Sequence, residues 1–261
     1  MDTSSHIPVV SIIMPAYNAQ KHIAESIRSI CRQTYTDWEL IVIDDCSGDN
    51  TYRIVQQLAR DEERIVLMRT DINSGSGIAR NMGIHVARGR FIAFCDSDDR
   101  WYDTKLAVQL PFMLNKGYEF TTTYYEDVDE DYTPFYVVKP ADGQTLQDVI
   151  LGCTVGTSEV IYDTQRIGKV FMPDFRRSQD WALWLRLLKK VPALHVCPQI
   201  LSQYMHNQKG VSRKKTAMVK AAINVYHVEL GYSYTKSWMI FLFRFLPRNI
   251  FKKLRKLKDN H

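Results

Sequence analysis

Three carboxylates lie within four positions directly after a short apolar run. The apolar residues are 91–94, and Asp96, Asp98 and Asp99 follow them. This pattern predicts a strand with acidic residues at its carboxyl end, where ligands bind in open α/β sheets. Clustered carboxylates repel one another, so a cation among them keeps them ionised. Oxygen ligands favour Mg²⁺ or Mn²⁺, and these ions usually bind together with phosphates. The alternative is a solvated turn, which an isolated acidic loop more often forms.

The elements that must position this cluster alternate through the first half of the chain. Apolar runs predict four buried strands, at residues 9–14, 40–43, 65–68 and 91–94. Amphipathic segments predict helices between them, with Asn18 capping the first and Asp49 or Asn50 the second. The third helix is expected from about residue 76, with Gly89 stopping it in a left-handed conformation. Its inward residues are expected to be Ile78, Met82 and Val86.

Strands that alternate with helices in this way predict a parallel, doubly wound sheet. The polar residues after each strand then meet at one edge of the sheet, where a nucleotide is expected. The second half of the chain is less regular. It predicts a helix at 105–115, a strand at 120–125, a proline-containing loop at 132–143 and a strong helix at 179–190.

Composition narrows the class of protein. The net charge of +5 is modest, and the five cysteines are odd in number and lack metal-ligand spacing, which favours reduced, buried thiols. The first residues lack the basic and apolar regions of a secretory signal, and no apolar run approaches the ~20 residues needed to span a bilayer. We therefore expect a cytoplasmic protein, attached at most to a membrane surface.

Four short motifs stand in order after the predicted strands and at the start of the last helix. They are PAYN at 15–18, IDDCS at 43–47, DSDD at 96–99 and QDW at 179–181. Together they resemble the family-2 glycosyltransferases of the GT-A fold, of the type that makes bacterial surface polysaccharides, over about residues 9–212. The resemblance implies metal-dependent transfer of a sugar from a nucleoside diphosphate sugar, with inversion at the anomeric carbon.

The resemblance also implies an α/β, GT-A-like, doubly wound mixed sheet. Its Rossmann-like nucleotide-binding half is expected at about 7–115 and its acceptor-binding half at about 116–233. These two halves form the expected domain, 1–233. A helical, basic, amphipathic tail is expected at 234–261.

The first two motifs and the third helix are implied to bind the nucleotide sugar. The backbone near Pro15 and Asn18 and the ring of Tyr17 would lie against the base, where an aromatic face contributes ~1–3 kcal/mol of stacking. Asp45 would accept the uracil N3–H, and Arg80 would reach toward the diphosphate. The alternatives are a packed loop aromatic for Tyr17, a helix cap for Asp45 and a solvated helix face for Arg80.

The acidic motif is implied to bind the ribose, the donor sugar and the metal. Asp96 would contact the ribose or a metal-bound water, and Ser97 would contact the nucleotide sugar. Asp99 would either contact the donor sugar or support the residues that bind the metal. Asp98 would ligate Mn²⁺ or Mg²⁺ directly. His206 is a second candidate metal ligand, although a lone histidine of this kind is more often structural.

Asp180 is the expected catalytic base, because inversion needs one carboxylate to take the proton of the acceptor hydroxyl. Family members usually have Glu-Asp here, whereas this chain has Gln179-Asp180, so the base is kept and the preceding carboxylate is lost. As a residue at a helix start, Asp180 is also suited to capping, and the two roles are compatible.

The C-terminal tail is aromatic and apolar over 238–246 and then strongly basic. This pattern favours an interfacial anchor on anionic lipid over a helix packed on the catalytic domain, and it suggests a lipid-linked saccharide acceptor. A nucleic-acid partner is not expected, because the predicted catalytic face is acidic and the basic residues are confined to the tail.

The leading hypothesis is an enzyme that transfers a hexose or N-acetylhexosamine from a UDP-sugar at the inner face of the cell membrane. One alternative is a nucleotidyltransferase, which would need a glycine-rich, basic loop after the first strand. A second is a non-catalytic nucleotide-sugar-binding or assembly protein, which would not need Asp180.

Overall fold

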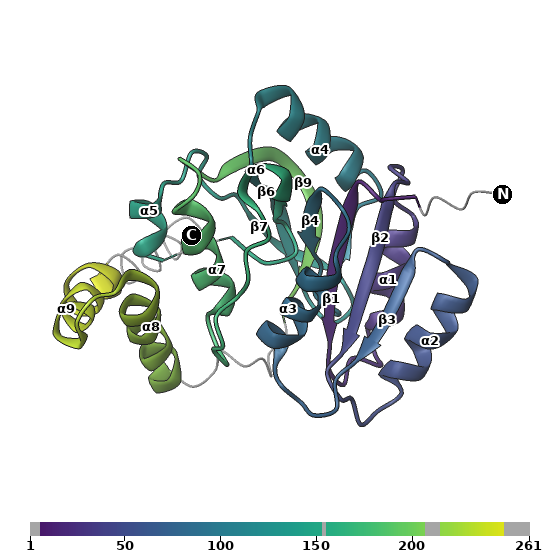
Figure 1. The fold of residues 1–261 in the computed structure, drawn as a ribbon, viewed down its shortest axis with the longest axis horizontal. Helices are drawn as coiled ribbons and strands as arrows, with labels where there is room; N and C mark the ends of the chain where they lie inside the picture. Colours follow the sequence, from purple (N-terminus) through teal and green to yellow (C-terminus); the bar gives the residue numbers. More distant parts are fainter. Residues whose placement is uncertain (1–5, 153–154, 207–214, 248–261) are drawn as a thin grey trace.

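A mixed nine-stranded sheet forms the centre of the computed structural model, which describes residues 6–152, 155–206 and 215–247 (Figure 1). The strand order is β3-β2-β1-β4-β8-β6-β9-β5, and β7 pairs with β6. The first half of the sheet is parallel, as predicted, and consists of β1 (Val10–Ala16), β2 (Trp38–Asp44), β3 (Ile65–Arg69) and β4 (Phe91–Phe94). Three helices connect these strands, α1 (Ile23–Cys31), α2 (Thr51–Asp61) and α3 (Ser76–Val86).

Both faces of this parallel half are buried. Alternate residues of β1 contribute to two different cores, with Ile12 on the face covered by α1 and Ile13 on the face covered by α3. This explains why the strands read as continuous apolar runs, since helices exclude water from each face.

The third helix presents a different face from the one predicted. Ala79, Gly83 and Ile84 are buried, whereas Val86 is exposed. A Cβ on Gly83 would lie only 2.6 Å from Ile13 Cγ2, so small residues let α3 approach the sheet closely. The prediction was right in part, since Met82 packs against the core, but it missed Ala79, Gly83 and Ile84 because close packing here requires small side chains.

Two residues predicted to mark helix ends have other roles. Asn18 lies five residues before α1 and makes no cap, whereas Asp49 Oδ1 does accept the Thr51 N–H at the start of α2, at 2.9 Å. Gly89 lies beyond the end of α3 and passes close to β1, where a Cβ would lie 2.5 Å from Ser11 N. Its smallness serves a backbone contact and not a left-handed helix stop.

The second half of the chain makes the sheet mixed. Its strands are β5 (Arg100–Trp101), β6 (Phe120–Val128), β7 (Pro134–Val138), β8 (Ile161–Asp163) and β9 (His195–Met205). Its first helices are α4 (Lys105–Lys116), α5 (Leu146–Ile150), α6 (Thr164–Ile167) and α7 (Gln179–Leu188). β8 runs antiparallel to β4 and β6, and β6 runs parallel to β9. The predicted loop at 132–143 was wrong in part, because β7 extends β6 into a hairpin.

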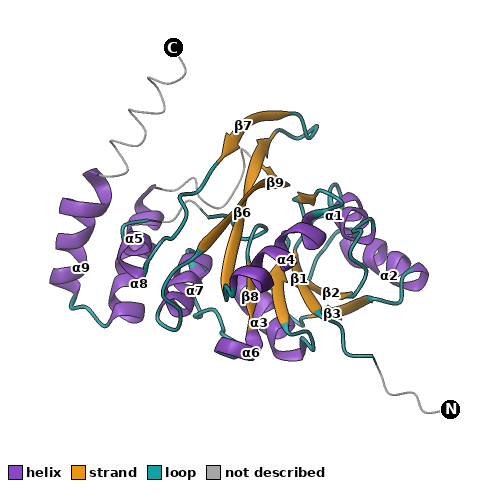
Figure 2. Cartoon of the chain, turned by 90° about the horizontal axis from the view of Figure 1, so that it is seen from above, coloured by secondary structure: helices purple, strands orange, loops and turns teal. Residues whose placement is uncertain are grey.

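The described C-terminal part is helical and packs beside α7 (Figure 2). It comprises α8 (Lys215–Leu230), α9 (Tyr234–Ile240) and a π-helical turn (Phe241–Phe245). Arg186 of α7 pairs with Glu229 of α8 at 2.7 Å, and the ring of Phe245 lies 5.8 Å from that of Trp181. Within the described ranges, no helix has both the length and the hydropathy to cross a membrane. The basic stretch 248–261 lies outside the described residues.

Candidate active site

The loops that follow β1, β2 and β4 meet at one edge of the sheet, because β1 pairs with both other strands. Asn18 joins the first two loops. Its backbone N–H donates to Ser47 Oγ at 3.0 Å, and its Oδ1 accepts the Gly48 N–H at 2.9 Å. Its φ of 48° is left-handed, a conformation that asparagine tolerates better than most residues.

Pro15 is buried in β1, whereas the neighbouring Tyr17 is 53% exposed. Tyr17 is therefore not a packed loop aromatic and offers its ring to a ligand.

Asp45 is almost completely buried and holds the loop that leads into α3. Its Oδ1 accepts hydrogen bonds from Thr70 Oγ1 at 3.0 Å and from the Ser74 N–H at 2.9 Å, and its Oδ2 accepts the Gly75 N–H at 2.7 Å. The neighbouring Asp44 is also buried and pairs with Arg69 Nε at 3.1 Å. Both carboxylates therefore brace loops at this edge.

Arg80 lies on the buried face of α3 and points toward the acidic motif. Its Nη2 is 2.5 Å from Asp96 Oδ1, and only 5% of the residue is exposed. The alternative of a solvated helix face is therefore wrong. Because the pair joins α3 to the loop after β4, it connects the predicted phosphate contact to the predicted metal site.

Asp98 and Asp99 follow Asp96 but have different surroundings. Asp99 is 1% exposed, with its Oδ2 accepting from Ser158 Oγ at 2.5 Å and its Oδ1 accepting the Met205 N–H at 2.9 Å. Asp98 stays partly exposed, as does Ser97, whose carbonyl oxygen accepts from Ser26 Oγ at 3.0 Å. Asp99 therefore ties the acidic loop to β9, whereas Asp98 is the more exposed of the two.

The crowding of these carboxylates raises their proton affinity. Burial, followed by repulsion from Asp96, raises the pKa of Asp98 to about 6. Burial, followed by Asp98 and Asp96, raises the pKa of Asp99 well above its usual range. Each effect disfavours accumulated negative charge, which a divalent cation would offset. Mg²⁺-type ions typically take one or two protein carboxylates and complete their coordination with phosphates and water. Asp98, with Asp96 beside it, fits such an ion.

His206 directly follows Met205, whose N–H donates to Asp99 of this loop. Its backbone N–H donates to Val128 O at 2.8 Å, and its exposed ring lies 5.9 Å from that of Phe135. Across the part of the chain that the structure describes, no three histidine, cysteine or acidic side chains are grouped to hold a metal. Any metal here would depend on phosphate oxygens for the rest of its coordination.

Asp180 lies in the first turn of α7 and reaches the same site. Ser178 occupies the cap position with a φ of 58°, so Asp180 itself is not the cap. Burial raises the pKa of Asp180, the Trp181 N–H and the charge of Arg80 oppose that shift, and Asp96 adds to it. The start of α7 lies against the start of α3, the helix that carries Arg80. Gln179 fixes the helix start, because its Nε2 donates to Ser76 Oγ of α3 at 2.6 Å.

Two further residues of the site escaped the sequence analysis. Ser158 Oγ accepts the Asp96 N–H at 2.9 Å while donating to Asp99, so one hydroxyl organises the acidic loop. Tyr132 at the tip of the β6–β7 hairpin donates to Asp98 O at 3.2 Å, and the Arg100 guanidinium lies 3.1 Å from its ring centre. A lone serine before β8 carries no motif. The unrecognised hairpin hid the position of Tyr132.

Comparison with known proteins bears on this geometry. The family model described as glycosyl transferase family 2 matches residues 11–158, more than half of the chain. The chain belongs to glycosyl transferase family 2. The matched family-2 region covers the PAYN, IDDCS and DSDD motifs, and it ends at Ser158.

Two family-2 relatives are similar over most of their length. The putative teichuronic acid biosynthesis glycosyltransferase TuaG of Bacillus subtilis is 36% identical over 220 residues, covering 84% of this chain and 87% of that protein. The Escherichia coli UDP-Glc:alpha-D-GlcNAc-diphosphoundecaprenol beta-1,3-glucosyltransferase WfgD is 36% identical over 214 residues, covering 81% and 83%. The predicted membership among bacterial family-2 glycosyltransferases is confirmed.

The fold is similar to that of TarS residues 1–349 from S. aureus, solved in complex with UDP-GlcNAc. The TM-score is 0.72 at 22% identity, covering 91% of this chain and 71% of that chain. This likeness supports the GT-A-like mixed α/β architecture predicted for this family-2 member.

Proposed function

We propose that this family-2 glycosyltransferase moves a hexose or N-acetylhexosamine from a UDP-sugar to a lipid-linked saccharide acceptor, with inversion, in the synthesis of a bacterial surface polysaccharide. The observation that carries the proposal is the convergence of Arg80, the Asp96–Asp98 carboxylates and Asp180 beside an exposed aromatic ring. The names of TuaG and WfgD support the class of product, and WfgD supports UDP-sugar and a lipid-linked acceptor.

The uridine would bind at the edge formed by the loops after β1 and β2. The exposed ring of Tyr17 is suited to stack on uracil, and the Pro15 and Asn18 backbones lie beside it. Asp45 would accept the uracil N3–H at Oδ2, which has a second lone pair, because Oδ1 already accepts two hydrogen bonds and Oδ2 only one.

The diphosphate would lie beside Asp98, with Ser97 and Asp96 toward the ribose. We assign Asp98 as the principal ligand of Mn²⁺ or Mg²⁺ and His206 as a secondary candidate. When bound, the metal neutralises charge on the departing diphosphate as a Lewis acid. Asp99 would act mainly by holding this loop in place, because it is buried and bonded on both oxygens. Arg80 would pair with Asp96 and contribute positive charge near the phosphates.

Asp180 would act as the general base. Its carboxylate takes the proton of the acceptor hydroxyl as that oxygen bonds to the anomeric carbon, the bond to the β-phosphate oxygen breaks, and UDP leaves with the electron pair. A base with a raised pKa suits this role, because it binds the proton more readily than an ordinary aspartate does.

The C-terminal helices support the proposed acceptor and the proposed location of the protein. Trp238, Met239, Leu242 and Phe243 are all exposed, with Phe243 76% exposed. Such a surface suits a peripheral position on the cytoplasmic face of a membrane, where a lipid-linked acceptor is found. We propose residues 1–233 as the catalytic domain and 234–261 as the membrane-associating tail.

The proposal is tested by measuring UDP release from a panel of UDP-sugars with bacterial membrane-lipid extract, in Mn²⁺ and in EDTA. Metal-dependent turnover of one donor is expected. Binding of UDP without turnover of any donor would favour the non-catalytic alternative, and the absence of UDP binding would overturn the proposed nucleotide site. Formation of a UDP-sugar from UTP and a sugar phosphate would favour the nucleotidyltransferase.

A further inference from the structure

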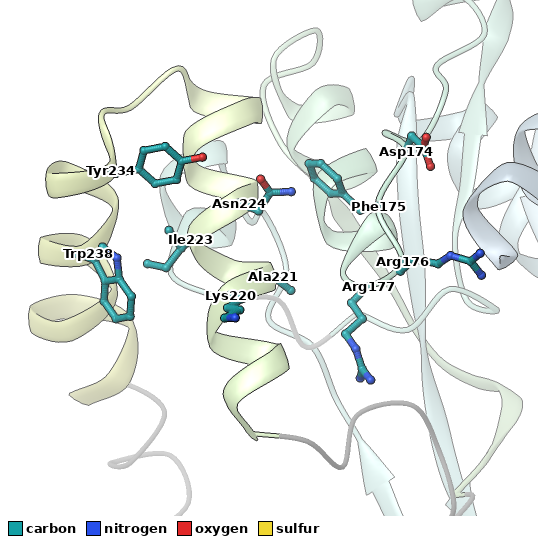
Figure 3. Close-up of a pocket in the computed structure, with 10 residues that line it drawn as sticks. All are labelled: Asp174, Phe175, Arg176, Arg177, Lys220, Ala221, Ile223, Asn224, Tyr234 and Trp238. Carbon is teal, nitrogen blue, oxygen red and sulfur yellow. The ribbon is translucent and has the colours of Figure 1, made fainter. Parts of the chain in front are cut away.

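A pocket of about 550 Å³ opens between the segment before α7 and the pair α8–α9 (Figure 3). Its walls combine basic and aromatic side chains. Phe175 and Tyr234 point toward α8 from opposite sides, and Trp238 projects from α9. The lining residues are Asp174, Phe175, Arg176, Arg177, Lys220, Ala221, Ile223, Asn224, Tyr234 and Trp238.

One end of this pocket is cationic. Arg176, Arg177 and Lys220 line it against the single acid Asp174. Arg176 is already engaged, because it donates to Asn73 Oδ1 at 3.1 Å and to Asn73 O at 3.2 Å. Arg177 differs in one atom, since its buried Nη1 donates to no acceptor among the residues described. A buried guanidinium nitrogen without a partner is costly, so an anionic group is the natural occupant of this end.

The other end is apolar and leads outward. Tyr234 is 59% exposed and Trp238 is 44% exposed. Ile223 of α8 lies between these two residues and the cationic end of the pocket. Met239 and Leu242 continue the exposed apolar surface beyond Trp238. The pocket therefore has the polarity of an amphiphile, with a charged head at Arg177 and an apolar chain along α9.

The position of Arg177 connects the pocket to the chemistry. It lies three residues before Asp180 and directly before the α7 cap residue Ser178. The opposite wall is held against α7 and α5, because Arg186 of α7 pairs with Glu229 and Tyr226 donates to Ile150 O of α5 at 2.9 Å. A head group at Arg177 would thus sit at a fixed distance from the proposed base.

We propose that this pocket binds the diphosphate of a prenyl-diphosphate-linked acceptor, with Arg177 and Lys220 on the phosphates and the first prenyl units along Tyr234 and Trp238. The inference rests on the proposed function, because it names how the acceptor is recognised. The sugar attached to such a diphosphate would extend from Arg177 toward Asp180, on the acceptor side of the site.

The test uses farnesyl diphosphate as the probe and the full chain saturated with UDP and Mg²⁺, so that the nucleotide site is blocked. We expect binding that is at least about tenfold weaker for farnesol, which lacks the phosphates. R177A should weaken farnesyl diphosphate binding about 10- to 100-fold, the range for charge-assisted hydrogen bonds, and R177K should fall between. The matched control is K116A, which removes an exposed cation at the end of α4. It should bind as the wild type does.

Three results separate the interpretations. Equal binding of farnesyl diphosphate to R177A and wild type, with UDP binding intact, would overturn the pocket alone. If the wild-type chain does not bind UDP, the proposed function is overturned instead. If R177A weakens binding to phosphatidylglycerol vesicles as much as binding to farnesyl diphosphate, the pocket is a general phospholipid head-group site. That result would also overturn the proposal. Intact UDP binding by R177A confirms that the variant is folded.

Discussion

Arg80 Nη2 lies 2.5 Å from Asp96 Oδ1, so a buried cation of α3 is joined to the first carboxylate after β4. The influence of this cation extends beyond its partner. Burial raises the pKa of both Asp98 and Asp180, and the positive charge of Arg80 opposes both shifts. One arginine therefore helps to keep the proposed metal ligand and the proposed base ionised.

Replacing Arg80 should displace the pH dependence of transfer. In R80Q the pKa of Asp180 rises further, and because a general base works only when ionised, the acidic limb of the kcat profile moves to higher pH. R80K keeps the charge and should leave the limb close to that of wild type. If the kcat of R80Q is lower than that of wild type but depends on pH in the same way, this coupling is contradicted.

Replacing the proposed general base, Asp180, should abolish transfer and leave UDP binding nearly unchanged. D180N is expected to lower kcat about 10²- to 10⁴-fold, the usual contribution of general acid–base catalysis, while the Kd for UDP stays within about twofold. Steady-state kinetics and calorimetric titration measure the two effects. D61N, which alters an exposed acid at the end of α2, is the control. If D180N retains wild-type kcat, another group accepts the proton.

Tyr17 should contribute to UDP affinity and little to stability, because half of it is exposed. Loss of base stacking in Y17A should cost about 1–3 kcal/mol, or roughly 5- to 150-fold in the Kd for UDP. Y17F keeps the ring and should bind within about twofold of wild type. Equal UDP affinity in Y17A would mean that the base lies elsewhere.

Ser158 should be needed for the shape of the acidic loop. In S158A, Asp99 Oδ2 and the Asp96 N–H both lose their partner in a buried region, at a cost of about 1–3 kcal/mol. Thermal unfolding should shift down by several degrees, and the affinity for Mn²⁺ in the presence of UDP should fall with it. S74A, which removes a hydroxyl that donates to Ile72 O at 3.3 Å, should change neither. Unchanged Tm and metal affinity in S158A would remove Ser158 from the site.

The membrane role of the tail is best tested by point changes. Phe241 is buried and Phe245 packs against Trp181, so truncation would disturb the core as well as any lipid contact. L242S/F243S alters only exposed side chains and should reduce sedimentation with anionic vesicles several-fold at unchanged Tm. I72S, at an exposed isoleucine of the nucleotide half, should sediment as wild type does. Equal sedimentation of both variants would refute the anchor.

The sequence by itself determined the parallel half of the sheet. Strands buried on both faces produce continuous apolar runs, and the polar residues at their ends carry the motifs, so β1 to β4 and the meeting of Tyr17, Asp45 and Asp96 at one edge were predictable. The helix with Asp180 was predictable as well, because its apolar residues follow the helical period. These signals are local in the chain.

Only the tertiary structure decided how the site is supported. The face of α3 that carries Arg80 is buried because Gly83 allows close approach to β1, a fact about shape that hydrophobic patterning does not record. Asp99 reads as an ordinary carboxylate until β9 and Ser158 surround it. The pocket at Arg177 exists because α8 and α9 fold back beside α7. Contacts between residues far apart in sequence leave no local period, so the structure alone revealed them.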